Sequence, residues 1–168
     1  DDVCRRSKRI DIYVDSELSD DALVDAAVST QMFVGARAVW DTSTLHAMFL
    51  TRAEPASIGL SSIGSRLTPV SIDDQYGLYI RMDGKPGSNA TTVRAPVAPG
   101  TVSDVDIMDW RKIMPGEQIE IDLHQGTIAL DGEREVELLP NQKVHAQLST
   151  DGPWVVDVSH AMMLLANL

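Results

Sequence analysis

Gly126-Thr127-Ile128-Ala129-Leu130-Asp131-Gly132-Glu133 is the stretch that decides the fold class of this chain. A strand-like apolar run reaches Asp131-Gly132, a dipeptide that strongly favours a type I′ turn, and residues 135–138 then alternate between polar and apolar. The stretch therefore predicts a β-hairpin. On these residues alone, Glu133 is a solvated side chain of the turn.

Similar alternating or apolar runs recur along the chain about every ten residues, a spacing typical of antiparallel sandwiches. The remaining strands are expected at residues 9–15, 36–40, 45–51, 77–82, 91–95, 102–110, 118–123, 143–148 and 154–158. We therefore predict a mainly-β (α+β) fold, an antiparallel β-sandwich with a few helices, built as a single domain over residues 1–168.

Three helices are expected in addition to these strands. Ser19 or Asp20 is a suitable cap for a helix over residues 21–28, with acidic residues in its first turn. Its buried stripe would be Leu23, Ala26 and Ala27. A short helix is expected over residues 57–64, and a third, packed against the sandwich, over residues 161–168. The aromatic side chains expected in the core are Trp40, Trp110 and Trp154.

Composition excludes several function classes. A net charge of −11 and a pI near 4.6 argue against binding to nucleic acid or to an anionic membrane. No apolar run approaches the roughly 20 residues that span a bilayer. The single Cys4 rules out an internal disulfide and fits a reducing compartment, so we expect a cytoplasmic location. The histidines have no spacing typical of a metal site: His46, His124, His145 and His160.

The segment Leu50-Thr51-Arg52-Ala53-Glu54-Pro55-Ala56-Ser57-Ile58-Gly59-Leu60-Ser61-Ser62-Ile63-Gly64 follows an apolar strand with small and hydroxyl residues. Small residues let a backbone approach a ligand. Glu54 could accept a hydrogen bond from a ribose hydroxyl or an amine, or could cap the short helix. The serine hydroxyls suit a sugar or phosphate, and serve equally as caps. An ordinary strand-to-helix turn remains the alternative. The candidate ligand-binding positions are Glu54, Ser57, Gly59, Ser61, Ser62 and Gly64.

Leu60-Ser61-Ser62-Ile63-Gly64, together with residues 33–40 and the Asp-Gly-Glu hairpin, resembles the C-terminal half of the NAD-kinase-like proteins. The resemblance covers residues 21–168 and is closest to the acetoin catabolism protein X family. It implies a β-sandwich that binds substrate and forms homo-oligomers. It also implies that Asp131 and Glu133 lie near a cleft that a second domain completes, where the full-length parent would use ATP and possibly NAD.

The sequence departs from the kinases in two places. Ile58 stands near the position of a tyrosine that lines their NAD site. Their catalytic Gly-Gly-Asp-Gly-Thr motif lies in an N-terminal α/β domain, and this sequence contains no Gly-Gly pair. The chain also begins without Met, which suits part of a longer protein. We therefore expect a domain without kinase activity of its own, requiring no cofactor to fold. The alternative is a non-catalytic β-sandwich that serves as a binding or assembly module.

Overall fold

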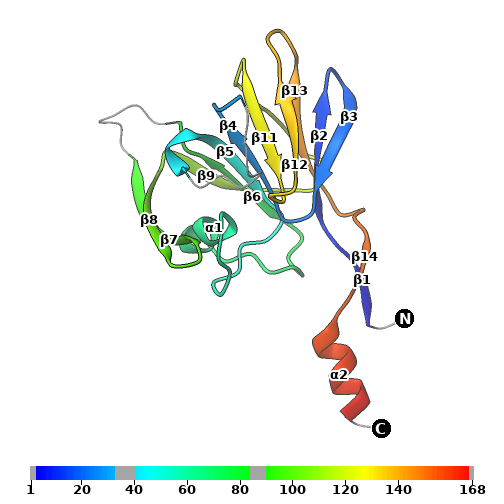
Figure 1. Cartoon of the computed structure of the whole chain (residues 1–168). Helices are drawn as coiled ribbons and strands as arrows, with labels where there is room; N and C mark the ends of the chain where they lie inside the picture. Colours follow the sequence, from blue (N-terminus) through cyan, green and yellow to red (C-terminus); the bar gives the residue numbers. More distant parts are fainter. Residues whose placement is uncertain (1–2, 33–40, 84–89, 167–168) are drawn as a thin grey trace.

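The computed structural model describes residues 3–32, 41–83 and 90–166, and in this part of the chain every strand pairing is antiparallel (Figure 1). One sheet has four strands in the order β10 (Gln118–Glu120), β13 (Val144–Ser149), β2 (Arg9–Val14) and β3 (Glu17–Ala22). The other has six, in the order β12 (Arg134–Leu138), β11 (Gly126–Leu130), β4 (Asp25–Ser29), β5 (Leu45–Leu50), β6 (Gly77–Arg81) and β9 (Asp109–Ile113). The predicted mainly-β fold is confirmed.

The six-stranded sheet is covered on both faces. Its inner face packs against the four-stranded sheet around Ile12, Phe49 and Ile128, which are almost completely buried. Its outer face packs against α1 (Ser61–Leu67) and a ribbon of β7 (Thr91–Ala98) and β8 (Thr101–Ile107). A short 3-10 helix, η1 (Thr42–Thr44), precedes β5. The domain therefore has three layers, and α1 sits in the outer one (Figure 1).

The prediction of a helix over residues 21–28 is wrong, and the packing on both faces of the six-stranded sheet explains why. Residues 26–28 pair with β11 on one side and β5 on the other, and their side chains face two cores. A strand buried on both faces loses the polar–apolar alternation that identifies a strand. Pairing on both sides overrides the helix propensity of the alanines. Leu23, expected in the core, lies in the β3–β4 turn and is 40 % exposed.

Several boundaries also differ from expectation. Pro96 does not end its strand, because β7 continues past an irregularity in the two-stranded ribbon, where a missing N–H is tolerated. The run over residues 102–110 divides at Met108 into β8 and β9, which pair with different partners. The helix expected over residues 57–64 begins at Ser61 instead. The strand at 36–40 and Trp40 lie outside the described residues.

The chain ends form a separate ribbon. Strand β1 (Cys4–Arg6) pairs with β14 (Trp154–Val156), and α2 (Val158–Ala166) then projects away from the sandwich (Figure 1). The C-terminal helix is therefore present, but none of its residues is buried, so the expected packing is wrong. Trp154 is 64 % exposed and Trp110 is 37 % exposed, so neither is a core residue.

Candidate active site at the β3–β4 turn

Three segments that are distant in the sequence meet around one hollow of about 330 Å³. Val24 and Asp25 come from the β3–β4 turn, residues 52–61 follow β5, and Asp131 comes from the hairpin turn between β11 and β12. Small-molecule sites typically occupy about 300–1,000 Å³. This candidate hollow is lined by five of the residues proposed from the sequence: Glu54, Ser57, Gly59, Ser61 and Asp131.

The loop over residues 52–61 is shaped by its own backbone. Ala53 and Val70 exchange N–H···O bonds of 2.9 and 3.0 Å, which close the base of the loop. The Ser57 N–H and hydroxyl both donate to the Glu54 carbonyl, at 3.0 and 2.7 Å. Gly59 has φ +107°, a conformation that other residues rarely adopt, and a Cβ there would meet only open space. The backbone of Gly59 therefore borders the candidate hollow without a side chain to fill it.

Asp131 has a structural role as well as a place in the hollow. The φ angles of Asp131 and Gly132, 52° and 70°, are both positive, as the type I′ turn predicted from the sequence requires. The Asp131 carboxylate accepts backbone N–H bonds from Leu23, Val24 and Asp25, at 2.8, 2.7 and 3.1 Å. Bonds to a charged acceptor are strong. The hairpin turn is thereby fixed against the β3–β4 turn.

Asp25 is a member of the site that the sequence did not reveal. Burial, followed by the negative charge of Asp131, raises its pKa from 3.8 to about 6. A carboxyl group that titrates near neutrality in a concave site is a marker of function. The residue was missed because the sequence pattern placed it in a helix, and only the pairing of β4 with β11 brings it to Asp131.

Arg52 is the second residue that sequence analysis missed. Thr51 fixes its position, because the Thr51 N–H donates to the Val24 carbonyl at 3.0 Å and the Thr51 hydroxyl donates to the Leu23 carbonyl at 2.7 Å. The half-buried Arg52 makes no ion pair or hydrogen bond through its guanidinium in the described part of the chain. It lines the candidate hollow and also a neighbouring side hollow of about 190 Å³, which reaches Lys8 and Val155.

The other proposed residues lie elsewhere. Ser62 is buried, and its hydroxyl donates to the carbonyls of Gly59 and Pro96, at 2.7 and 3.1 Å, which ties α1 to β7. Gly64 is packed under α1, where a Cβ would stand 2.4 Å from Leu50 Cδ1. Glu133 is exposed on the hairpin turn and does not line the candidate hollow.

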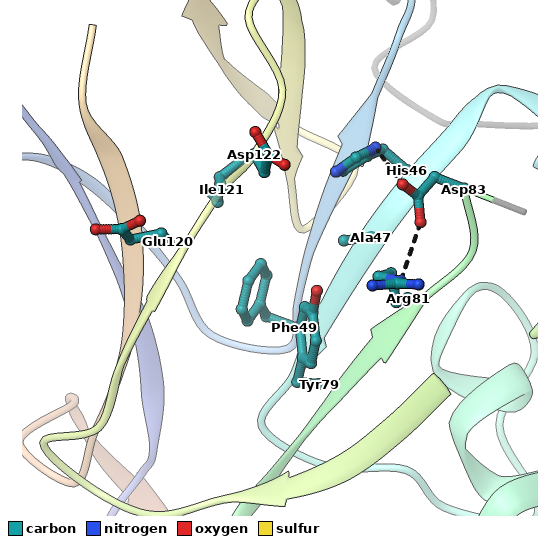
Figure 2. A pocket seen from close by; sticks show the side chains of 9 residues that line it. All are labelled: His46, Ala47, Phe49, Tyr79, Arg81, Asp83, Glu120, Ile121 and Asp122. Carbon is teal, nitrogen blue, oxygen red and sulfur yellow. Dashed lines mark ion pairs between the residues drawn. The ribbon is translucent and has the colours of Figure 1, made fainter. Parts of the chain in front are cut away.

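A smaller hollow of about 110 Å³ opens between the two sheets, and Figure 2 shows the side chains that line it. Asp83 lies 3.2 Å from Arg81 Nε and 3.6 Å from His46 Nδ1. The rings of Phe49 and Tyr79 lie 5.1 Å apart, and burial raises the pKa of Tyr79. Because Asp83 already pairs with Arg81 and the hollow is only about 110 Å³, it is a weaker candidate for a ligand site.

Neither a metal site nor a membrane segment is found in the described ranges. No three histidine, cysteine or carboxylate side chains there are arranged to hold a metal ion. Among the same residues, no helix is both long and apolar enough to cross a bilayer.

Residues 8–151 match the family model described as the acetoin catabolism protein X C-terminal domain. This chain belongs to the acetoin catabolism protein X family. The match includes every segment that lines the candidate hollow. A relative in the family, acetoin catabolism protein X of Cupriavidus necator (strain H16), is 37 % identical over 160 residues. The alignment covers 93 % of this chain and 44 % of the relative, so the chain spans less than half of that protein.

Proposed function

We propose that this acetoin catabolism protein X domain is the substrate-binding half of a two-domain, NAD-kinase-like phosphotransferase that acts in acetoin catabolism. The observation that carries the proposal is the candidate hollow, in which Asp25, Asp131 and the 52–61 loop with Arg52 and the serine hydroxyls converge from three separate segments. The natural polypeptide would then carry a preceding α/β domain that holds ATP. The 168-residue chain has no turnover of its own in this scheme, and any ATP hydrolysis or phosphoryl transfer by it contradicts the proposal.

The residues present fit a nucleotide or another hydroxylated substrate, such as NAD. The Arg52 guanidinium can bind phosphate oxygens through paired N–H groups. Ser57 and Ser61, whose hydroxyls lie 3.2 Å apart, can contact a sugar, and the Asp25 carboxylate can accept a bond from a sugar hydroxyl. Transfer of a phosphoryl group requires mainly positioning and charge stabilisation, and ATP bound by the other domain would supply the group.

The binding proposal is tested by calorimetric titration of NAD and ATP into the full-length polypeptide and its variants. Arg52→Ala is expected to weaken binding by at least about tenfold, the scale of a lost charge-assisted contact. Arg66→Ala is the matched control, because Arg66 is exposed on α1 and does not line the hollow. Unchanged affinity in Arg52→Ala removes this hollow from the binding site.

The second candidate function is a non-catalytic binding or assembly module. It is favoured by β10, a three-residue strand at the outer edge of the four-stranded sheet, since open strand edges invite pairing. We propose homo-oligomers in either case. A coding sequence that places an α/β segment with Gly-Gly-Asp-Gly-Thr before this domain supports the kinase-like proposal, and its absence supports the assembly module.

A further inference from the structure

The C-terminal strand and helix expose a succession of large apolar side chains. Its members are 57–67 % exposed and lie on consecutive parts of β14 and α2: Trp154, Val156, Val158, Met162 and Leu165. We call this surface the terminal strip. Trp154 and Val156 share one face of β14 because they are two residues apart, and the three helical members share one face of α2.

The composition of helix α2 is poorly suited to exposure to water. Its nine residues include no Asp, Glu, Lys or Arg, only Ser159 and His160 are polar, and none of the nine is buried. A helix with so few polar residues is normally packed against other protein, and one this short is marginal without packing. The helix is also far too short to cross a membrane. The terminal strip therefore requires a covering protein surface.

The geometry points to the preceding domain of the same polypeptide as that cover, and we propose that the terminal strip anchors it. The pairing of β1 with β14, Cys4 opposite Val156, delivers any residues before β1 to the start of α2 (Figure 1). The chain spans only 44 % of its Cupriavidus relative and matches a C-terminal domain, so most of a protein of that kind lies ahead of it. The inference rests on the two-domain organisation of the proposed function, not on its chemistry.

The terminal strip also adjoins the candidate active site. Val155, at the centre of β14, lines the side hollow, which shares Val24 and Arg52 with the candidate hollow. Val155 points to the opposite face of β14 from Trp154 and Val156, so a domain held on the terminal strip would be separated from Arg52 by the β1–β14 ribbon. The strip would then fix the preceding domain to the same ribbon that borders the side hollow.

Hydrogen–deuterium exchange on the full-length polypeptide and on the 168-residue chain tests the docking. We expect the amides of residues 158–166 to exchange at least about tenfold more slowly in the full-length protein, because a packed helix opens less often. Val158→Glu and Met162→Glu should abolish that protection. Val102→Glu is the matched control, because Val102 is 55 % exposed on β8, outside the strip.

Two results overturn the proposal. One is equal exchange of α2 in the two proteins. The other is protection of α2 in the 168-residue chain through a second copy, with a dimer mass that Val158→Glu converts to a monomer. The proposed function is tested separately by nucleotide titration. Protection of α2 without nucleotide binding would therefore contradict the proposed nucleotide substrate but support the docking of the preceding domain.

Discussion

At the scale of the residue, Asp131 joins the hairpin turn to the β3–β4 turn through three backbone N–H groups. Asp131→Asn keeps the shape and removes the charge, so we expect a loss of about 2 kcal/mol in the free energy of unfolding. In a domain of this size that loss lowers Tm by about 4–8 °C. Glu135→Gln, at an exposed position of β12, is the control. An unchanged melting curve for Asp131→Asn contradicts this role.

The raised pKa of Asp25 makes the free energy of unfolding depend on pH. Its pKa is raised from 3.8 to about 6, so its favourable contribution is complete below pH 3.8 and is lost as the pH rises through 6. The loss is about 2–3 kcal/mol. Asp25→Asn has no such loss, so the variant should gain stability relative to the wild type between pH 4 and pH 7. Denaturant titrations of both proteins across this range measure the difference, and a constant difference refutes the assignment.

At the scale of the element, α1 is held against the six-stranded sheet at Gly64. A Cβ at this position would lie 2.4 Å from Leu50 Cδ1 and 3.0 Å from the Ala53 Cβ. Gly64→Ala should therefore destabilise the domain by about 1–2 kcal/mol, since overpacking outweighs the better helix propensity of alanine. Gly64→Ala should leave nucleotide affinity unchanged, because Gly64 does not line the candidate hollow. Thermal unfolding and titration on one variant separate these effects.

The elements that could be predicted from the sequence are those with a local signal. The hairpin around Asp131-Gly132 and strands β2, β5 and β13 follow from turn chemistry and apolar patterning. Strand β4 could not be predicted, because burial on both of its faces is decided by distant strands. The apolar residues of the C-terminal segment predict helix α2. They do not predict that the helix is exposed, because apolar composition normally indicates burial.

The candidate site was predictable to a similar extent. The small-residue loop and Asp131 have local signatures, and five of their residues do line one hollow. The roles of Asp25 and Arg52 depend on the residues that surround them in the fold. Burial, followed by the charge of Asp131, raises the pKa of Asp25, and Asp131 lies more than one hundred positions away along the chain. No local pattern in a single sequence indicates that Asp25 and Asp131 lie close together.

At the scale of the whole molecule, the sheet edges bear on assembly. Strand β10, with Glu120 as its one charged residue, leaves one edge of the four-stranded sheet open, whereas the opposite edge strand, β3, carries three, Glu17, Asp20 and Asp21. Charges on an edge strand discourage pairing. We therefore expect a homodimer or higher even-numbered oligomer formed at the β10 edge. Light scattering at tens of micromolar should give at least twice the monomer mass, and a monomer mass contradicts the expectation.

The ribbon of β1 and β14 also determines how the domain responds to tension. Both chain ends leave it at the Cys4–Val156 pair, and the ladder continues inward through Arg5–Val155 to Arg6–Trp154. A force that pulls the two chain ends apart therefore breaks the residue pairs of the ladder one after another, and does not load all of them at once. Beyond the ribbon, the Ser7 N–H donates to the Pro153 carbonyl and the Gly152 N–H donates to the Ser7 carbonyl. The ribbon should thus open at low force and act as a compliant link, while the two sheets behind it stay folded.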